Sequence, residues 1–447
     1  MSIVSQAVGH YHELLSQRAG SAADMLAAVY AEQERRGVVY ATRAIPTMLR
    51  PQFISGKQDA LLEYSLAVLA RALEKVIKLY AEEEYVRAAI PFPADAVPYF
   101  MKPTGLRRNL MIARFDAFLQ GSDLKYIEFN TDSPASVVWN EVHQEVFDEL
   151  SVMQEFRTKY RLRTLEPRRM LQEALLEAHR DFGLSEAPSL AIVDWRDVAT
   201  WPEFELAKAW FDANGLPTVL ADPRELEVRN GALWAGDTKI NLVYRRVIWR
   251  ELLNRKTDCQ PLFDAVDQGL ACVANPFRAK VAGNKAMLSF LRNPDHAHLF
   301  DAEENAVIER HIPWTAVLRH RPVRFEGRRA DPFDLAVADK DGFVLKPLNA
   351  YGGRGVLMGD EASQTDWEQA LAEAEGGGWC LQRRVNIPEA EFPVMEGGLH
   401  FEPRKINLNP FSIGGQYGGC LTRVSTNSII NVTAGGGMIP TYAVLED

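Results

Sequence analysis

The feature that most constrains the fold of this chain is a pair of short alternating segments separated by a polar connection. Ile112-Ala-Arg-Phe-Asp-Ala-Phe and Tyr126-Ile-Glu-Phe-Asn both alternate with a period of two residues, which is the side-chain period of a β-strand. The connection Leu119-Gln-Gly-Ser-Asp-Leu-Lys is short enough for an antiparallel hairpin. We therefore predict a hairpin over residues 112–130.

The register of this hairpin decides which side chains meet. If the turn centres on Ser122 and contains no bulge, residues whose numbers sum to 244 lie opposite each other. Asp116 then faces Glu128 and Arg114 faces Asn130, and all four side chains point to one side of the sheet. The other side carries the apolar residues Phe115, Ala117, Ile127 and Phe129.

The opposed acids indicate a cation site. Two carboxylates directly opposite each other repel at a cost of a few tenths to about 1 kcal/mol, and a divalent cation between them turns repulsion into attraction. Asp, Glu and the amide oxygen of Asn are hard donors that suit Mg²⁺. We predict a Mg²⁺ site at Asp116, Glu128 and Asn130, beside which Arg114 can pair with a phosphate or a substrate carboxylate. An exposed hairpin face with ordinary cross-strand ion pairs is the alternative.

A glycine-rich segment follows a later predicted strand. Lys346 lies in Phe343-Val-Leu-Lys-Pro-Leu, which leads into Tyr351-Gly-Gly-Arg-Gly-Val-Leu-Met. This pattern predicts a hairpin flap whose backbone at Gly352, Gly353 and Gly355 can approach phosphates closely, with charge from Lys346 and Arg354. It is neither a dinucleotide-binding fingerprint, because strand-like residues follow the glycines, nor a GxxxxGK[ST] phosphate loop. A simple β-turn with a solvated arginine is the alternative.

Three further residues lie in segments suited to nucleotide or anion binding. Lys285 is at the first turn of a predicted helix, where a cation opposes the helix dipole by about 0.3–1 kcal/mol and a bound anion would compensate it. Arg423 precedes the Gly435-Gly-Gly loop, and Gln382 follows the predicted strand Trp379-Cys-Leu, where it can read an adenine edge. An ordinary surface lysine and a strand-end glutamine are the alternatives for Lys285 and Gln382.

Composition and the remaining motifs exclude several classes of protein. The net charge of −10 argues against nonspecific nucleic-acid binding. The apolar runs are too short to span a bilayer and the N-terminus has no signal sequence, so we expect a cytoplasmic protein with no membrane partner. We find no Gly-x-Ser-x-Gly elbow, no Cys–His pair and no CxxC, and we interpret His296 and His298 as structural.

The order of predicted elements indicates an α/β fold. Residues 1–90 have a helical pattern, and the period is clearest from Asp59 to Ile77. A buried strand at 189–194 and another strand at 218–221 flank a helix near 203–213, and Arg229-Asn-Gly predicts a hairpin turn. From about residue 270 we expect short strands alternating with glycine turns. At 447 residues, two or three domains are expected.

Taken in order, these motifs resemble those of the circularly permuted ATP-grasp ligases, and are similar to the synthetase domain of glutathionylspermidine synthetases. The matching elements are Arg114-Phe-Asp, Glu128-Phe-Asn, Asn284-Lys-Ala, Lys346-Pro with its glycine turn, Gln382 and Thr422-Arg. The acids precede the lysines, which is the order that circular permutation produces. The resemblance implies an N-terminal helical region (1–100), a Rossmann-like pre-ATP-grasp substrate region that includes the hairpin (101–265) and an ATP-grasp nucleotide-binding region (266–447).

The resemblance also implies roles for the candidate residues. Asp116, Glu128 and Asn130 would be Mg²⁺ ligands, Lys285 and Lys346 would hold the phosphates of ATP, and Gln382 would lie near the adenine. Arg114 and Arg423 would stabilise the transferred phosphoryl group and the acyl phosphate, with Arg354 supplying further charge from the glycine flap.

The expected activity is therefore a ligase reaction. The γ-phosphoryl group of ATP would pass to a small-molecule carboxylate, an amino acid or a peptide, and an amine would then attack the acyl phosphate to give an amide. Such a reaction needs charge neutralisation and alignment more than a protein nucleophile. The alternatives are a nucleotide-binding pseudoenzyme or interaction module of the same fold, and an ATP-dependent phosphotransferase that stops at the phosphorylated product.

Overall fold

The predicted hairpin lies toward one edge of the largest sheet in the computed structural model, which describes residues 2–350, 352–430 and 436–446. Over these residues the strand order is β3-β23-β22-β21-β4-β5, with β20 beside β21 and β6 beside β23. Only the pairing of β3 with β23 is parallel in this sheet. The strands are β3 (Gln52–Ser55), β4 (Ile112–Gln120), β5 (Asp123–Asn130), β6 (Leu162–Arg163), β20 (Glu389–Val394), β21 (His400–Ile413), β22 (Gln416–Ser425) and β23 (Gly437–Val444).

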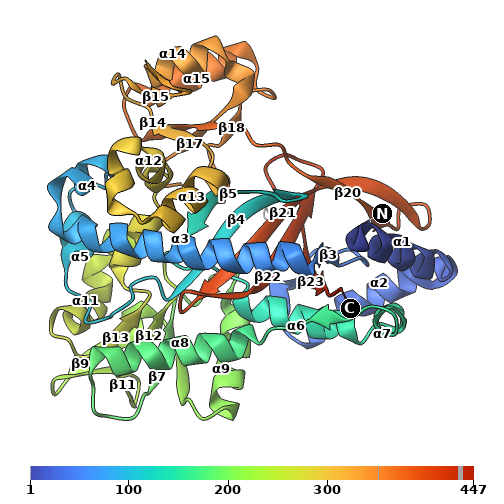
Figure 1. Ribbon diagram of the computed structural model, residues 1–447. Helices are drawn as coiled ribbons and strands as arrows, with labels where there is room; N and C mark the ends of the chain where they lie inside the picture. Colours follow the sequence, from blue (N-terminus) through green and yellow to red (C-terminus); the bar gives the residue numbers. More distant parts are fainter. Residues whose placement is uncertain (1, 351, 431–435, 447) are drawn as a thin grey trace.

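One long helix covers this sheet. Helix α3 (Gly56–Glu82) begins with a capping box in which Ser55 and Gln58 satisfy each other's backbone N–H groups. Its buried residues recur at three- and four-residue steps and pack against β21, β22 and β23. In Figure 1 the helix runs across the middle of the molecule in front of the sheet. The helical pattern predicted from Asp59 to Ile77 is confirmed.

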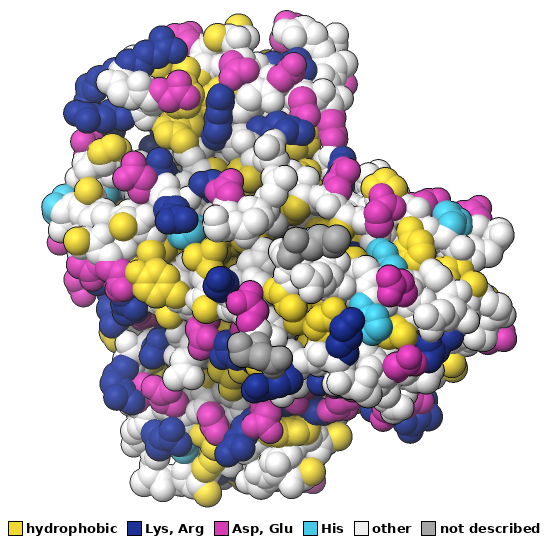
Figure 2. All heavy atoms as spheres, turned by 45° about the vertical axis from the view of Figure 1, so that its right-hand side comes forward, with side chains coloured by type: hydrophobic (Ala, Val, Ile, Leu, Met, Phe, Trp, Pro, Cys, Tyr) yellow, Lys and Arg dark blue, Asp and Glu magenta, His cyan; other side chains and the backbone are white. Residues whose placement is uncertain are grey.

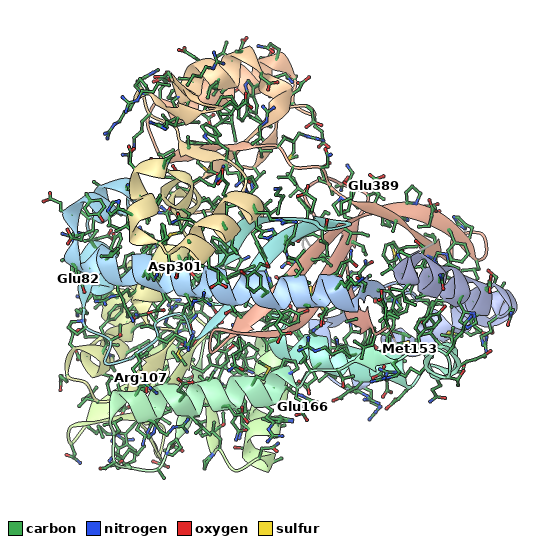
Figure 3. The ribbon with its side chains drawn as sticks, in the orientation of Figure 1. Glu82, Arg107, Met153, Glu166, Asp301 and Glu389 are labelled. Carbon is green, nitrogen blue, oxygen red and sulfur yellow. The ribbon has the colours of Figure 1, made fainter. Side chains whose placement is uncertain are left out.

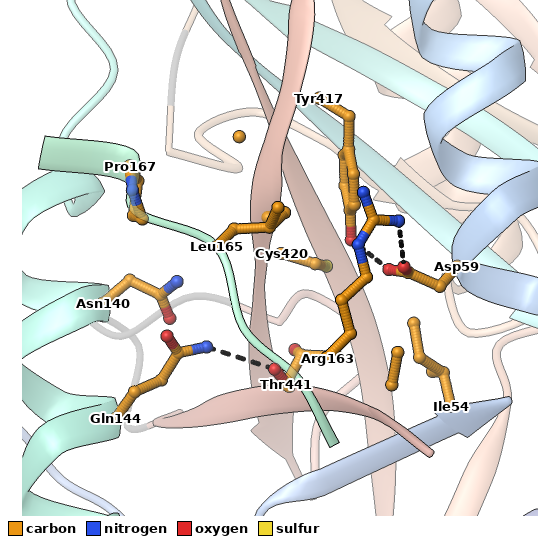
Figure 4. A pocket seen from close by; sticks show the side chains of 13 residues that line it. Ile54, Asp59, Asn140, Gln144, Arg163, Leu165, Pro167, Tyr417, Cys420 and Thr441 are labelled. Atoms are coloured by element: carbon orange, nitrogen blue, oxygen red, sulfur yellow. Dashed lines mark hydrogen bonds and ion pairs between the residues drawn. The ribbon is translucent and has the colours of Figure 1, made fainter. Parts of the chain in front are cut away.

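A partly buried ion pair fixes the start of α3 to the sheet. Asp59 Oδ2 accepts a hydrogen bond from Arg163 NH1 at 2.7 Å, and its Oδ1 accepts one from Tyr417 Oη at 2.9 Å (Figure 4). Burial raises the pKa of Asp59, against the opposing effects of Tyr417 and Arg163. Residues from α3, β6 and β22, far apart in the sequence, are thereby joined at one point.

A second, parallel sheet lies below the first in Figure 1 and has the order β13-β12-β7-β8. Helix α8 (Pro167–Phe182) packs on β12 and β13, and α9 (Trp201–Ala213) packs on β8. The buried strand predicted at 189–194, the helix near 203–213 and the strand at 218–221 are confirmed. The strands are β7 (Leu190–Val193), β8 (Thr218–Ala221), β12 (Leu242–Arg245) and β13 (Cys272–Ala274).

The hairpin predicted at Arg229-Asn-Gly is also present, between β9 (Leu226–Arg229) and β10 (Ala232–Ala235). Its two turn residues have left-handed φ angles, 51° for Asn230 and 69° for Gly231, as a tight hairpin turn requires. β11 (Thr238–Ile240) completes this small sheet, whereas β12, which follows at once, joins the parallel sheet.

A third sheet, of order β14-β19-β17-β18, lies at the top of Figure 1 beneath α14 and α15. Its core packs Phe343, Leu345 and Leu381 against Trp367. A separate hairpin, β15–β16, lies beside it. The elements are β14 (Thr315–Val317), β15 (Val323–Phe325), β16 (Arg328–Ala330), α14 (Pro332–Ala338), β17 (Phe343–Pro347), β18 (Leu357–Met358), α15 (Gln364–Ala374) and β19 (Trp379–Arg383).

The expectation of strands and glycine turns beyond residue 270 was incomplete, because three helices in this part of the chain were not predicted. Helix α13 (Ala302–His311) starts at a capping box of Asp301 and Glu304, and Glu304 also accepts a hydrogen bond from Lys75 of α3. Figure 3 labels Asp301 at this junction. Aspartate and serine caps also begin α14 and α15. These capping residues mark helix starts in the sequence, but the prediction for this part of the chain was based on its glycine clusters instead.

The remaining elements surround the sheets. Residues 1–90 are mainly helical as predicted, with β1, β2 and β3 inserted between α2 and α3. The further helices and strands are α1 (Ile3–Ser16), α2 (Ala22–Arg35), β1 (Val39–Tyr40), β2 (Arg43–Ala44), α4 (Glu84–Ala89), α5 (Val97–Met101), α6 (Val137–Asp148), α7 (Ser151–Arg157), α10 (Trp249–Asn254), α11 (Gln260–Asp267) and α12 (Ala286–Arg292). Short 3₁₀ turns are η1 (Ala19–Ser21), η2 (Pro223–Glu225), η3 (Lys256–Cys259), η4 (Phe277–Gly283), η5 (Pro294–Leu299) and η6 (Lys340–Gly342).

The surface shown in Figure 2 does not by itself indicate a binding face. Figure 2 shows one face on which acidic, basic and hydrophobic side chains are interspersed. Among the described helices, none combines the length and the apolar character that a membrane span requires.

Truncating the buried face of α3 should destabilise the protein. Leu69 is 0% exposed in the main core, so Leu69→Ala should lower the free energy of unfolding by about 2–5 kcal/mol. Lys78→Ala, on the exposed side of the same helix, should change it by less than about 0.5 kcal/mol. Urea denaturation measures both variants, and equal effects would contradict this packing.

Candidate active site

The β4–β5 hairpin carries the acid pair in the predicted register, although by a different route. Asp116 pairs with Glu128 and Arg114 with Asn130. The turn is Gly121-Ser122, with Gly121 at a φ of 61°, so it centres half a residue earlier than expected. A register shift between Asp116 and Ala117 then moves the pairing by one residue, so that the numbers of paired residues sum to 244 beyond it, as predicted. The two departures cancel at the acids.

The same bulge corrects one expectation about the buried face. Tyr126, not Ile127, pairs with Ala117 and lies in the core, 0% exposed. Ile127 instead lines a cavity on the polar side. Phe115 and Phe129 remain on the buried face as predicted, with ring centroids 4.7 Å apart.

Asp116 is held among positively charged and amide groups. Its Oδ1 lies 3.4 Å from Arg114 Nε and accepts a hydrogen bond from Asn130 Nδ2 at 2.9 Å, while its Oδ2 lies 3.4 Å from Arg423 NH1. Burial lowers the pKa of Arg423 to about 10, reinforced by the charge of Arg114 and opposed by Asp116. Arg423 comes from β22, so the folded sheet brings together residues 307 positions apart.

Glu128 faces a second group of cations. Its Oε1 accepts a hydrogen bond from Lys285 Nζ at 3.1 Å. Burial alone would raise the pKa of Glu128, but the charges of Lys285 and Lys346 outweigh it, and the pKa is lowered. Burial lowers the pKa of Lys346 to about 8, although Glu128 opposes the shift. The charges of the two lysines therefore favour the ionised form of Glu128, and Glu128 in turn reduces the cost of burying Lys346.

Lys346 is oriented by a chain of hydrogen bonds across the third sheet. Its Nζ donates to Gln382 Oε1 at 2.7 Å and to the carbonyl of Ile127 at 3.3 Å. The Nε2 of Gln382 donates to Thr315 Oγ1 at 3.0 Å. Both ends of the Gln382 amide are thus engaged within the protein, and its contact with an adenine stays a prediction.

The glycine segment forms the hairpin turn predicted between β17 and β18. Gly352, Gly353 and Gly355 have φ angles of 67°, 74° and 71°, a region that side-chain-bearing residues rarely adopt. A Cβ added at Gly353 would lie 2.6 Å from Ile429 Cγ2, so no side chain fits there without movement. Residue 351 of this segment and residue 435 of the later glycine loop fall outside the described residues.

These groups meet at a cavity of about 680 Å³ between the large sheet, the third sheet and the edge of the parallel sheet. Two predicted residues, Lys285 and Gly355, do not line it; Lys285 reaches it through Glu128 and also donates to the carbonyl of Ala350. The predicted residues on its wall are Arg114, Asp116, Glu128, Asn130, Lys346, Gly352, Gly353, Arg354, Gln382 and Arg423.

The cavity also contains ionisable residues that were not predicted. Asp194 follows β7 and Arg246 follows β12. Because the carboxyl ends of parallel strands meet at one edge of a sheet, both side chains reach the cavity there. Their positions directly after predicted strands could have identified them from the sequence. Burial raises the pKa of Asp194 to about 7, with Arg246 opposing the shift. Lys280 lies in η4, where no pattern marked it, and burial lowers its pKa.

The donor set fits a hard divalent cation next to phosphate groups. Asp116 and Glu128 present carboxylate oxygens from adjacent strands, and Asn130 can add its amide oxygen if the amide turns over from its present hydrogen bond. Over the described residues, no group of three or more His, Cys, Asp or Glu side chains could hold a metal ion. Because Mg²⁺ commonly uses one or two carboxylates together with phosphate oxygens and water, two acids are sufficient.

Comparisons with known proteins define the fold. No family model matches the chain. Uncharacterised proteins of Mycobacterium leprae (strain TN) and Mycobacterium tuberculosis (strain H37Rv) are each 24% identical to it over 436 residues, covering 90% of this chain and 72% and 74% of theirs. A glutathione synthetase-like effector from Globodera pallida, solved in its apo form, superposes with a TM-score of 0.64 at 12% identity, covering 96% of this chain and 97% of that one. The chain therefore has a mixed α/β fold similar to that of a glutathione synthetase-like protein.

Burial of Lys346 should appear in the pH dependence of stability. Because its pKa is about 8 in the folded protein against an ordinary value of 10.5, the unfolded chain binds more protons between these pH values. The free energy of unfolding should therefore rise with pH across this window, by up to about 1.4 kcal/mol per pH unit relative to Lys346→Met. Below pH 8 the cost of burying the charge is fully present.

Urea titrations at pH 7, 8, 9 and 10 compare the wild type with Lys346→Met, and with Lys78→Met as a control on an exposed lysine. A difference between wild type and Lys346→Met that stayed constant over this range would show that Lys346 has an ordinary pKa.

Proposed function

We propose that this protein is an ATP- and Mg²⁺-dependent ligase that joins a carboxylate to an amine through an acyl phosphate. The observation that carries the proposal is the opposed pair Asp116 and Glu128, enclosed by cations from four separate elements: Arg114 on β4, Arg423 on β22, Lys346 on β17 and Lys285 at the start of α12. The fold likeness to a glutathione synthetase-like protein supports it.

The acids would hold Mg²⁺, which supplies charge neutralisation at the phosphates when bound. Asp116 and Glu128 would be its ligands, with Asn130 as the third. Lys346 would bind a phosphate oxygen, and the hydrogen bond from its Nζ to Gln382 at 2.7 Å already orients the ammonium group toward the cavity. Lys285 would act from behind Glu128, and Gln382 would lie near the adenine.

The arginines would stabilise the charge that develops on the transferred phosphoryl group. Arg114 and Arg423 approach Asp116 from two different strands, both at 3.4 Å, so a phosphate placed beside that acid meets both guanidinium groups. Arg354 would contribute from the glycine turn, whose backbone can approach the phosphates because residues 352, 353 and 355 carry no side chain. The turn would exclude water from the acyl phosphate.

The parallel-sheet region would bind the substrates. Asp194 and Arg246 reach the same cavity from its edge, which suits an amine and a carboxylate respectively. We infer a circularly permuted ATP-grasp arrangement because the acids of β4 and β5 precede the lysines of α12 and β17 in the chain. Residues 1–100, 101–265 and 266–447 would form the helical, Rossmann-like substrate and nucleotide-binding regions of a cytoplasmic enzyme.

Neutralising either acid should abolish turnover. Asp116→Asn and Glu128→Gln keep the side-chain shape but remove the charge that holds the metal, so Mg²⁺-dependent ADP release should fall by about 100-fold or more. Asp123→Asn, on the exposed turn of the same hairpin, should keep full activity. The assay is ADP release in a screen of amino acids, short peptides and polyamines, alone and in pairs.

Three results would contradict the proposal. Full activity in both acid variants would exclude the metal assignment. ATP binding without turnover under every substrate pair would indicate a pseudoenzyme. A phosphorylated product that accumulates without any amine would indicate a phosphotransferase.

The glycine turn should control how well ATP hydrolysis is coupled to amide formation. Gly353→Ala places a Cβ against Ile429, so the turn must shift, and amide formation should fall by about 10- to 100-fold while the ratio of ADP to amide rises. Gly397→Ala is the matched control. Gly397 lies in the β20–β21 turn with a similar φ, 73° against 74°, and a Cβ added there meets no atom within 4 Å. An unchanged ratio in Gly353→Ala, measured by ADP assay and mass spectrometry, would exclude a role in water exclusion.

A further inference from the structure

A second cavity, of about 470 Å³, lies between α4, α12, β14 and the β15–β16 hairpin and shares no lining residue with the candidate active site. Five arginines line it, and Asp295 is the one acidic residue on its wall. Because the whole chain carries a net charge of −10, this concentration of positive charge stands apart from the rest of the molecule. The arginines are Arg292, Arg319, Arg321, Arg324 and Arg329.

These arginines lack the carboxylate partners that several arginines elsewhere in the protein have. Arg36, Arg163 and Arg168 each pair with two or more carboxylates, whereas none of the five cavity arginines forms an ion pair among the described residues. The Nε of Arg292 is buried and has no hydrogen-bond partner among the residues that the structure describes. Arg319 NH1 donates to the carbonyl of Ala88 at 3.3 Å, and among the described residues the guanidinium groups of the other four make no hydrogen bond, so their donors can reach an anion.

The register of the β15–β16 hairpin places two of these charges directly opposite each other. Arg324 pairs with Arg329, and both line the cavity. Like charges in this position destabilise an antiparallel pair, and a bound anion removes the repulsion. This is the converse of the opposed acids on the β4–β5 hairpin.

The cavity also has aromatic surfaces. Tyr85 is 43% exposed at its rim, and Trp314 contributes to its wall. His296 stacks on Phe290 with ring centroids 3.9 Å apart, which leaves one imidazole face directed away from that ring. Rings beside guanidinium groups suit a ligand that has both a flat base and phosphate groups.

We propose that this cavity is a second binding site, for a small phosphorylated ligand of the nucleotide class. Guanidinium groups bind phosphate in a bidentate manner, and several of them around one concave site suit one or more phosphate groups. A concave site of this size fits a mononucleotide better than a polymer, and the net acidic chain disfavours nucleic acid.

The test compares neighbouring arginines on one hairpin. Calorimetric titrations with AMP and with ribose 5-phosphate would use protein carrying Lys346→Met, which weakens the candidate active site. In this background Arg329→Gln should weaken AMP binding by about tenfold, because it removes a charge-assisted hydrogen bond. Arg328→Gln is the matched control, since it makes the same change in net charge one residue away, outside the cavity.

Two further measurements fix the class of ligand. AMP should bind more tightly than ribose 5-phosphate, and Tyr85→Leu should reduce that preference while leaving ribose 5-phosphate binding unchanged. Equal weakening by Arg328→Gln and Arg329→Gln would show nonspecific attraction and overturn the proposal. Equal affinity for the two probes, or binding of neither at millimolar concentration, would overturn it as well. Arg324→Gln repeats the test if Arg329→Gln does not fold, as judged by urea denaturation.

Discussion

The repulsion between Asp116 and Glu128 is the interaction on which the arrangement of the site depends. The two carboxylates are directly opposed on β4 and β5, and neither would be stable there without nearby positive charge. That charge comes from two strands of the large sheet, from the start of α12 and from β17 of the third sheet, so the site exists only when these elements have assembled. Burial in turn lowers the pKa values of Lys346, to about 8, and Arg423, to about 10. The cations are thus costly to bury, and the acids offset that cost. Such a preorganised set of charges is what phosphoryl transfer requires.

The sequence allowed the acid pair to be predicted, but not the geometry that produces it. The period-two pattern of both strands predicted the face that carries the acids, whereas it did not reveal the two-residue turn or the bulge beside Asp116, which place Tyr126 in the core instead of Ile127. Lys346 and its glycine turn were marked by local composition.

The contact between Arg423 and Asp116 spans 307 positions and has no local signal, so only the resemblance placed Arg423 in the site. Lys280 was missed for the same reason, while Asp194 and Arg246 could have been found from the rule that parallel strands deliver their carboxyl ends to one edge.

Opposed like charges recur at a second place in this protein, with the opposite sign. On the β15–β16 hairpin Arg324 faces Arg329, and no carboxylate in the described chain pairs with either. In both hairpins the backbone register imposes a repulsion that a bound ion of the opposite sign would relieve. Fold likeness alone does not establish an activity, because one fold can support different functions. The chemistry of these two hairpins is therefore the stronger guide to what the protein binds.

A crystal structure with Mn²⁺ and a non-hydrolysable ATP analogue would show directly whether the opposed acids bind metal, because anomalous scattering locates the ion. If Asp116 and Glu128 hold the metal, a peak should lie between them, about 2 Å from a carboxylate oxygen of each and bridged to the phosphates of the analogue. Nucleotide bound in the cavity of about 680 Å³ with no metal at these two acids, or metal bound elsewhere with both acids still paired to Arg114, Arg423 and Lys285, would contradict the metal assignment.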